Sequence, residues 1–141
     1  MRRGVLTAAA AVLLATAGCN RRPSPAVEAA VGHEVEISSE TLDFGRADTL
    51  YFGRMGSGER VEKTLTLLNT DTLTWVVLDV YSGCGCLSAE FSRLPVAPGE
   101  TATVTLRLDT AGYEGWIFKY ADINTSLSSV PKRIFVDAEA Y

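Results

Sequence analysis

Thr101-Ala-Thr-Val-Thr-Leu-Arg-Leu-Asp109 alternates polar and apolar side chains along its whole length. Successive side chains of an extended strand point to opposite faces, so this alternation predicts a β-strand with one face in a core and the other in water. The residues expected to face the core are Ala102, Val104, Leu106 and Leu108. Those expected to face water are Thr101, Thr103, Thr105 and Arg107. A strand of this kind needs a second layer of structure to cover its apolar face.

Further β-type runs precede and follow this strand, at 61–67, 75–81, 116–120 and 133–139. The run at 75–81, Trp-Val-Val-Leu-Asp-Val-Tyr, is so dense in apolar residues that we expect a strand covered on both sides. Gly, Pro, Asn and Asp, which tight turns need, separate the runs at 69–71, 98–100 and 111–115. No stretch after residue 34 has a clear helical apolar period. The pattern predicts an antiparallel all-β sandwich of about seven strands.

The N-terminal segment has the features of an export signal. Arg2 and Arg3 precede an apolar run at 5–17, which is too short to span a bilayer as a mature helix. Ala17-Gly-Cys19 then resembles a bacterial lipobox, in which the cysteine is acylated and becomes the new N-terminus, although Thr16 stands where Leu is usual. We therefore expect a lipoprotein signal peptide at 1–18 and a lipid on Cys19. The alternative is an ordinary signal peptide cut near Ala17.

Export sets the expected organisation of the mature chain. Residues 19–34 contain two prolines and few large apolar side chains, so we expect a flexible tether that leads to one β-sandwich domain at 35–141. Removal of 18 of the 141 residues leaves 123 and changes the formal charge from −4 to −6, because Arg2 and Arg3 are lost. An acidic domain repels nucleic acid, so nucleic-acid binding is not expected.

Two features could indicate catalysis, and neither does so here. Phe52-Gly-Arg-Met-Gly-Ser-Gly-Glu59 lacks the Lys-Ser/Thr ending of a phosphate loop and precedes a strand, so we interpret it as a glycine-rich β-turn. His33 is the only histidine, and it lies in the expected tether, where no rigid nucleophile–base pair can form. The sequence therefore predicts a protein that is not an enzyme.

Three threonines lie in the pattern Asp-Thr-aliphatic: Thr49, Thr72 and Thr110. The pattern resembles a short O-glycosylation acceptor that one group of Gram-negative bacteria uses on exported proteins. The alternative is that Asp-Thr simply forms turns, because both side chains bond to nearby backbone groups.

Tyr81-Ser-Gly-Cys-Gly-Cys-Leu87 is the most distinctive motif of the chain. Residues two apart in an extended strand have Cα atoms about 6.6 Å apart, which is near the outer limit for a disulfide, and Gly85 could relax the backbone enough for one. The same geometry would place the thiolates of Cys84 and Cys86 side by side for Cu(I). Zinc fits less well, because a closed zinc site needs four ligands. A purely structural pair of half-buried cysteines is the third alternative.

Taken in order, these motifs resemble the domain of unknown function 1573 family over residues 42–139. The resemblance is carried by Phe52-Gly53, Leu65 to Asn69-Thr70, Cys84-Gly-Cys86, Val96-Ala-Pro-Gly-Glu100 and Val104 to Asp109. The family comprises exported, often lipid-anchored proteins of Gram-negative bacteria, so the resemblance implies an immunoglobulin-like sandwich and no established activity. Gly83 and Leu87 stand where the family usually has Ser or Thr, and Asp71 stands where its turn usually has Gly.

Together, these features predict a non-catalytic lipoprotein of the cell envelope that acts as a binding or structural module without a cofactor. We expect a membrane attachment through the lipid, and an envelope protein or a glycan as partner. Lipoproteins sent to the cell exterior resemble one another in having acidic residues after the acylated cysteine. This chain has Arg21 and Arg22 there, so we expect it to be anchored in the outer membrane with the domain facing the periplasm. The alternative function is the handling of copper or thiols by Cys84 and Cys86.

Substitution of the acylation site tests the anchor. Cys19→Ser removes the thiol that would carry the lipid and lies outside the predicted domain, so the variant should fold and lose stable membrane association. Fractionation of membranes and intact-mass measurement of the wild-type N-terminus check this. A mature protein that begins elsewhere than at Cys19 would contradict the prediction.

Overall fold

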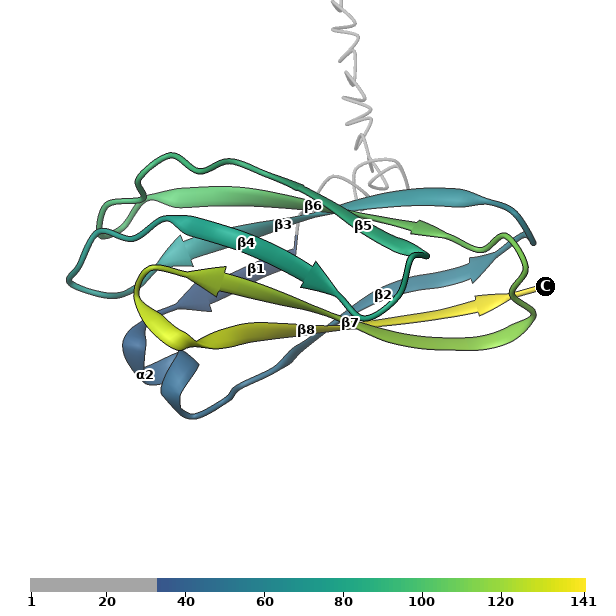
Figure 1. Cartoon of the computed structure of the whole chain (residues 1–141), viewed down its shortest axis with the longest axis horizontal. Helices are drawn as coiled ribbons and strands as arrows, with labels where there is room; N and C mark the ends of the chain where they lie inside the picture. Colours follow the sequence, from purple (N-terminus) through teal and green to yellow (C-terminus); the bar gives the residue numbers. More distant parts are fainter. Residues whose placement is uncertain (1–32) are drawn as a thin grey trace, which may run out of the picture. The chain divides into compact units, whose positions relative to one another are not determined.

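Two four-stranded sheets pack face to face in the computed structural model, which describes residues 33–141 (Figure 1). Sheet A has the order β1 (His33–Ile37), β3 (Arg60–Asn69), β6 (Thr101–Asp109), β5 (Leu87–Phe91). Sheet B has the order β2 (Asp48–Met55), β8 (Ser128–Ala140), β7 (Gly115–Thr125), β4 (Val77–Ser82). The predicted all-β sandwich is confirmed, with eight strands in the described residues. No helix within 33–141 is long and apolar enough to cross a membrane.

The core lies between the sheets and follows the alternation seen in the sequence. Val104, Leu106 and Leu108 on β6 are fully buried, as are Leu65 and Leu67 on the neighbouring strand β3. Sheet B supplies the opposite side of the core with the fully buried side chains Ala121, Ile123, Ile134 and Val136. Because burial of apolar area is the main driving force for folding, this double layer accounts for the fold.

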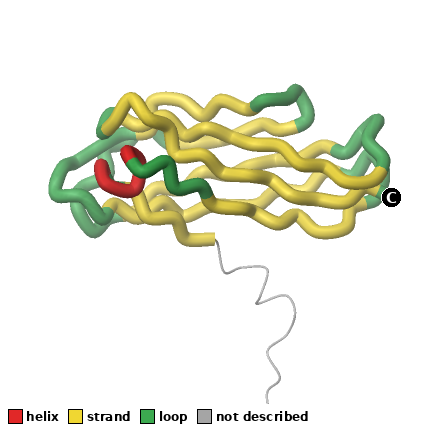
Figure 2. The backbone as a smooth tube through the Cα atoms, turned by 90° about the horizontal axis from the view of Figure 1, so that it is seen from below, coloured by secondary structure: helices red, strands yellow, loops and turns green. Residues whose placement is uncertain are grey.

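The sequence predicts an antiparallel sandwich, but two of the strand pairs are parallel. β1 runs parallel to β3, and β2 runs parallel to β8. Alternation along a strand sets which face is buried but carries no information on the direction of its partner. The one-turn helix α2 (Ser39–Asp43) connects β1 to β2 and takes the chain from sheet A to sheet B at one end of the sandwich (Figure 2). Its five residues are too few to produce a helical period in the sequence.

Two sequence interpretations are corrected by the structure. The run at 75–81 is not covered on both sides: Trp75 is buried outside β4, whereas Leu78 and Tyr81 on β4 are 46% and 56% exposed. β4 is an edge strand, and only one of its faces meets the core. The domain also begins earlier than residue 35, because β1 starts at His33. The signal peptide at 1–18, Cys19 and the expected tether up to residue 32 lie outside the described residues.

Asp71 attaches helix α2 to the loop between β3 and β4. Its Oδ2 accepts hydrogen bonds from the backbone N–H of Ser39 at 2.8 Å and from the Ser39 hydroxyl at 2.7 Å. Its Oδ1 accepts from the N–H of Leu73 at 3.0 Å. The Ser39 bonds, followed by the Leu73 bond, lower the pKa of Asp71 from 3.8 to about 2. The turn predicted at 69–71 thus also anchors helix α2.

This lowered pKa predicts an acid-dependent loss of stability. Because the folded-state pKa lies below the unfolded value, the stabilisation is fully present above about pH 4 and is lost as the pH falls towards and through 2. Asp71→Asn should therefore flatten the dependence of the unfolding free energy on pH in this window, and Ser39→Ala should flatten it in part. Urea unfolding at a series of pH values measures this. An unchanged slope in Asp71→Asn would contradict the assignment.

Candidate functional site

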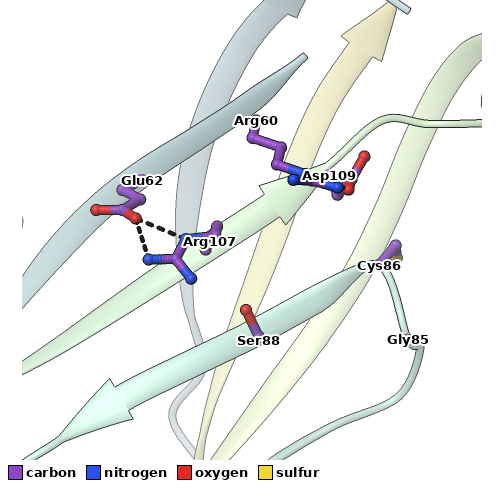
Figure 3. A pocket seen from close by; sticks show the side chains of 7 residues that line it. All are labelled: Arg60, Glu62, Gly85, Cys86, Ser88, Arg107 and Asp109. Carbon is purple, nitrogen blue, oxygen red and sulfur yellow. Dashed lines mark hydrogen bonds and ion pairs between the residues drawn. The ribbon is translucent and has the colours of Figure 1, made fainter. Parts of the chain in front are cut away.

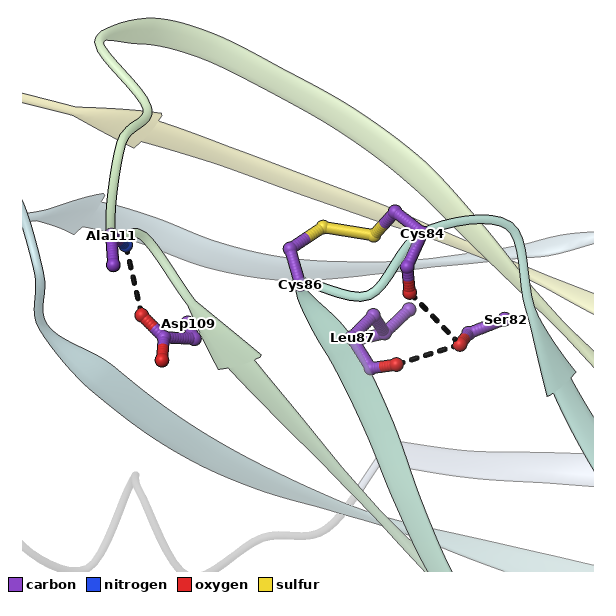
Figure 4. Close-up of a disulfide and its surroundings, with 6 residues drawn as sticks. All are labelled: Ser82, Cys84, Cys86, Leu87, Asp109 and Ala111. Carbon is purple, nitrogen blue, oxygen red and sulfur yellow. Dashed lines mark hydrogen bonds between the residues drawn. A yellow bond between two sulfur atoms is a disulfide. The ribbon is translucent and has the colours of Figure 1, made fainter.

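Cys84 and Cys86 are joined by a disulfide in the turn between β4 and β5 (Figure 4). Their Cα atoms are 5.2 Å apart, closer than in the extended strand that we had assumed, because the chain crosses here from sheet B to sheet A. The Ser82 hydroxyl lies 2.6 Å from the carbonyl oxygen of Leu87 and 3.2 Å from that of Cys84. The covalent bond and these polar contacts hold both ends of the turn together.

A disulfide offers no thiolate, so the copper alternative would require reduction of the pair. Within residues 33–141, no group of three or more His, Cys, Asp or Glu side chains could hold a metal ion. Copper handling therefore stays a prediction.

A charged hollow of about 460 Å³ lies beside the disulfide, on the outer face of sheet A (Figure 3). Arg60 Nε lies 2.6 Å from Asp109 Oδ2, and Arg107 pairs with Glu62 and, at 3.6 Å, with Glu90. A hydrogen bond from the Ala111 N–H and the neighbouring Arg60 lower the pKa of Asp109, while Glu62 raises that of Arg107. Each arginine already has a carboxylate partner, so this hollow offers no unpaired cation for a ligand. Exposed pairs of this kind add little stability.

A second hollow, of about 400 Å³, contains an unusually buried lysine. Lys132 is 3% exposed, and its Nζ lies 2.7 Å from Asp48 Oδ2 and donates to the carbonyl of Arg46 at 2.7 Å. His33 Nε2 lies 4.0 Å from the other oxygen of Asp48. His33 is thus held in β1 beside a carboxylate, and the assumption that it lies in a tether is wrong. We interpret this cluster as structural, because a buried ammonium must be paired to remain charged.

The outer face of sheet B carries most of the exposed aromatic side chains. The strand register places Tyr51 opposite Asp137 and Asp137 opposite Phe118, with Trp116 opposite Glu139 in the next row. Tyr51, Trp116 and Phe118 are 64%, 74% and 55% exposed. We call this surface the aromatic face; its aromatic members are Tyr51, Tyr81, Trp116, Phe118, Tyr120 and Phe135.

Several contacts fix the aromatic face in place. The rings of Phe118 and Phe135 stack with centroids 5.1 Å apart. The Arg133 guanidinium lies 4.3 Å from the ring centroid of Tyr120 and donates two hydrogen bonds of 2.8 Å to Asp122, which raises the pKa of Arg133. This surface was not predicted from the sequence. The available signal was the run at 116–120, in which the aromatic residues occupy alternate positions and so share one face.

Tyr120 also explains why Gly83 precedes the cysteine pair. A Cβ atom at residue 83 would lie 2.9 Å from Cε1 of the Tyr120 ring. The backbone N–H of Gly83 donates to the carbonyl of Tyr120 at 3.3 Å, and this is where β4 loses contact with β7. The departure from the usual Ser or Thr thus accommodates an aromatic ring that is packed onto the backbone.

The three candidate glycosylation threonines do not form one site. Thr110 is fully buried, and its hydroxyl donates to the carbonyl of Gly56 in the turn between β2 and β3 at 2.7 Å. The interpretation of Thr110 as an acceptor is therefore wrong for the folded domain. Thr49 is half-buried on β2, and Thr72 is exposed in the loop between β3 and β4. Modification of these two residues stays a prediction.

Residues 35–140 match a family model described as protein of unknown function (DUF1573). The chain belongs to this family. The match confirms the resemblance found in the sequence, and the family description names no catalytic activity for the DUF1573 domain. No curated protein matches the chain.

Solved structures similar to this DUF1573 chain support the fold alone, because their sequence identities are low. A protein of unknown function from Porphyromonas gingivalis W83 has 20% identity and a TM-score of 0.55, with 66% of this chain and 44% of that one covered. The VesB protease of Vibrio cholerae has 14% identity and a TM-score of 0.54, with 72% and 33% covered. The secreted serine protease VesC of Vibrio cholerae has 13% identity and a TM-score of 0.50, with 64% and 21% covered. This chain spans less than half the length of each.

The packing at Gly83 in this DUF1573 domain can be tested with a matched pair of glycines. Gly83→Ala should lower the free energy of unfolding by about 1 kcal/mol, because the added methyl group must displace the half-exposed Tyr120 ring. Gly85→Ala is the control, since no atom lies within 4 Å of a Cβ at that position. Urea unfolding of both variants measures the difference. Equal stabilities would show that the Tyr120 ring does not pack closely on Gly83.

Proposed function

We propose that this domain is a non-catalytic binding module of the bacterial cell envelope that contacts its partner through the aromatic face. In this proposal, a lipid on Cys19 anchors the protein to the outer membrane with the domain facing the periplasm. The partner is an envelope protein or a glycan. Both kinds of partner have surfaces that stack on aromatic rings and hydrogen-bond to the polar groups between them.

The observation that carries the proposal is the contrast between the two outer faces of the sandwich. On sheet A, paired charges and threonines face outward; Thr64 and Thr105, for example, share a hydrogen bond of 3.0 Å across β3 and β6. On sheet B, Tyr51, Trp116 and Phe118 are each more than half exposed. Contiguous apolar patches are rare on monomeric proteins unless they bind something, and tyrosine and tryptophan are enriched at binding hot spots.

The polar groups among these rings favour specific recognition over non-specific hydrophobic association. Arg54 pairs with Glu139 at 3.3 Å, and Arg133 pairs with Asp122. The carboxylate of Asp137 has no hydrogen bond or ion pair to another residue in the part of the chain that the structure describes. It lies between Tyr51 and Phe118 in the register, where a partner could satisfy it.

The alternative proposal is thiol handling by Cys84 and Cys86. One observation favours it: both cysteines are only half-buried, and Cys86 lines the charged hollow on sheet A. The double variant Cys84→Ser/Cys86→Ser separates the two proposals, because it removes all thiol and copper chemistry of the domain and leaves the aromatic face in place.

The proposal predicts that envelope contacts depend on the aromatic face. Tagged full-length protein is cross-linked in intact cells of the source bacterium, and the cross-linked products of wild type and Tyr51→Ser/Phe118→Ser are compared. Loss of two hot-spot side chains should reduce the specific products by about tenfold or more. Phe44→Ser is the matched control, because Phe44 is an exposed aromatic residue outside this face.

Products that persist in Tyr51→Ser/Phe118→Ser but disappear in Cys84→Ser/Cys86→Ser would overturn the proposal and support thiol handling. Loss in Phe44→Ser as well would mean that the contacts are not specific to the aromatic face.

A further inference from the structure

β4 and β7 pair over only part of the length of β7. The pairing runs from Val77↔Thr125 to Ser82↔Ala121, and the hydrogen bond from Gly83 to Tyr120 is the last link. β7, however, begins at Gly115 and pairs with β8 along its whole length. The segment Gly115–Lys119 therefore has a partner on one side only. Figure 1 shows β4 ending near the middle of the sandwich while β7 continues towards the end that carries the C-terminus.

The direction of the backbone groups in this segment follows from Tyr120. In an antiparallel strand, the N–H and C=O of one residue point to the same side, and the side alternates along the chain. The Tyr120 carbonyl points towards Gly83, so the backbone groups of Phe118 and Trp116 also point to the side of β4. Those of Ile117 and Lys119 point to β8. Within residues 33–141, no group pairs with the backbone of Trp116 or Phe118 on the open side.

Other edges of sheet B carry features that discourage pairing. On β4, the Arg93 guanidinium donates to the carbonyl of Leu78 and so covers part of the edge. On β2, the register shifts between Tyr51 and Gly53, which bends the strand. Proteins commonly protect sheet edges with charges and bulges of this kind. The free half of β7 has no register shift, and its one charged side chain, Lys119, lies with its Nζ 5.4 Å from the ring centroid of Tyr113. Its side chains Trp116 and Phe118 are exposed.

We propose that Gly115–Lys119 is a strand-addition site that receives an extended, basic peptide segment of the partner protein. The added strand runs antiparallel to β7, in line with β4, and its backbone bonds to the free groups of Trp116 and Phe118. The inference rests on the proposed function and commits it to a protein partner. The disulfide turn sets the boundary of the site, because it carries the chain away from β7 after Gly83.

Two unpaired carboxylates near the edge favour a basic peptide, and the ammonium of Lys119 already lies beside the Tyr113 ring. Glu114 is exposed directly before the segment, and Asp137 is paired in register with Phe118. Neither carboxylate has an ion-pair partner among the described residues. Lysine or arginine at alternate positions of the added strand would lie beside the Trp116 and Phe118 rings, where cations bind the ring faces. The intervening residues would face Lys119 and the partly buried Tyr113.

The test uses the full-length protein in detergent and the synthetic peptide acetyl-Lys-Val-Lys-Val-Lys-Val-Lys-amide. Binding is followed by the emission of Trp116, since Trp75 is buried and contributes a constant background. We expect saturable binding with a blue shift. The same peptide with its third residue, Lys, N-methylated on the backbone lacks an N–H that faces β7, and it should bind at least about tenfold more weakly. The peptide with Glu in place of Lys should bind at least about tenfold more weakly as well.

A pair of variants at one position isolates the backbone contribution. Phe118→Ala removes the ring and keeps the N–H, whereas Phe118→Pro removes both. Because this N–H points away from β8, proline leaves the β7–β8 ladder intact. Phe118→Pro should raise the Kd about tenfold above that of Phe118→Ala. If Phe118→Pro does not fold, amide exchange of wild type saturated with peptide replaces it, and the amides of Trp116 and Phe118 should become protected.

Any of four results would overturn the inference. The two Phe118 variants could bind with equal affinity, or the peptide could bind without protecting these amides. Binding could also fail to saturate, or the Glu peptide could bind equally well. A dimer in sedimentation velocity that the peptide does not dissociate would overturn it too, since a second copy would then occupy the edge. The variant Tyr51→Ser distinguishes a failure of the strand-addition inference from a failure of the proposed function. Tyr51 lies on β2, with β8 between it and β7, so its substitution affects the aromatic face and should leave peptide binding unchanged.

Discussion

The departure of the chain from sheet B at Gly83 is the constraint on which the exposed edge of sheet B depends. The Tyr120 ring lies where a side chain at residue 83 would be, and the disulfide between Cys84 and Cys86 closes the turn that follows. After this turn the chain continues as β5 in sheet A. The crossing therefore links the two sheets near the middle of the sandwich and leaves half of β7 without a neighbour on one side.

The two sheets share one core but differ in the chemistry of their outer faces. Their inner faces share one core, in which Leu106 and Val136 are fully buried. The outer face of sheet A presents paired charges and hydroxyls, which are well hydrated and need no partner. The outer face of sheet B presents rings beside an unpaired carboxylate and ends in an open edge. One partner could then contact both the edge and the face. Backbone hydrogen bonds at the edge would provide affinity, and side-chain contacts on the face would provide specificity.

The sequence predicts the burial pattern well because side-chain alternation is local. The inward-facing residues of β6 and the sandwich itself follow from it, and the family motifs agree. What the sequence could not show depends on contacts between distant segments: the parallel pairing of β1 and β2, the edge position of β4, and the burial of Thr110. The cysteine pair was found as a motif, but its geometry was misjudged because a turn replaces the assumed strand. The open half of β7 depends on where β4 stops, which is at the contact between Gly83 and Tyr120.

Amide hydrogen exchange of the free protein tests the central claim most directly, because it reports the backbone groups at the open edge one residue at a time. The account predicts that the amides of Trp116 and Phe118 exchange nearly as fast as those of an unstructured chain. The amides of Ile117 and Lys119, which point to β8, should exchange orders of magnitude more slowly. Slow exchange at all four positions would mean that β7 is already paired on both sides and would contradict the account.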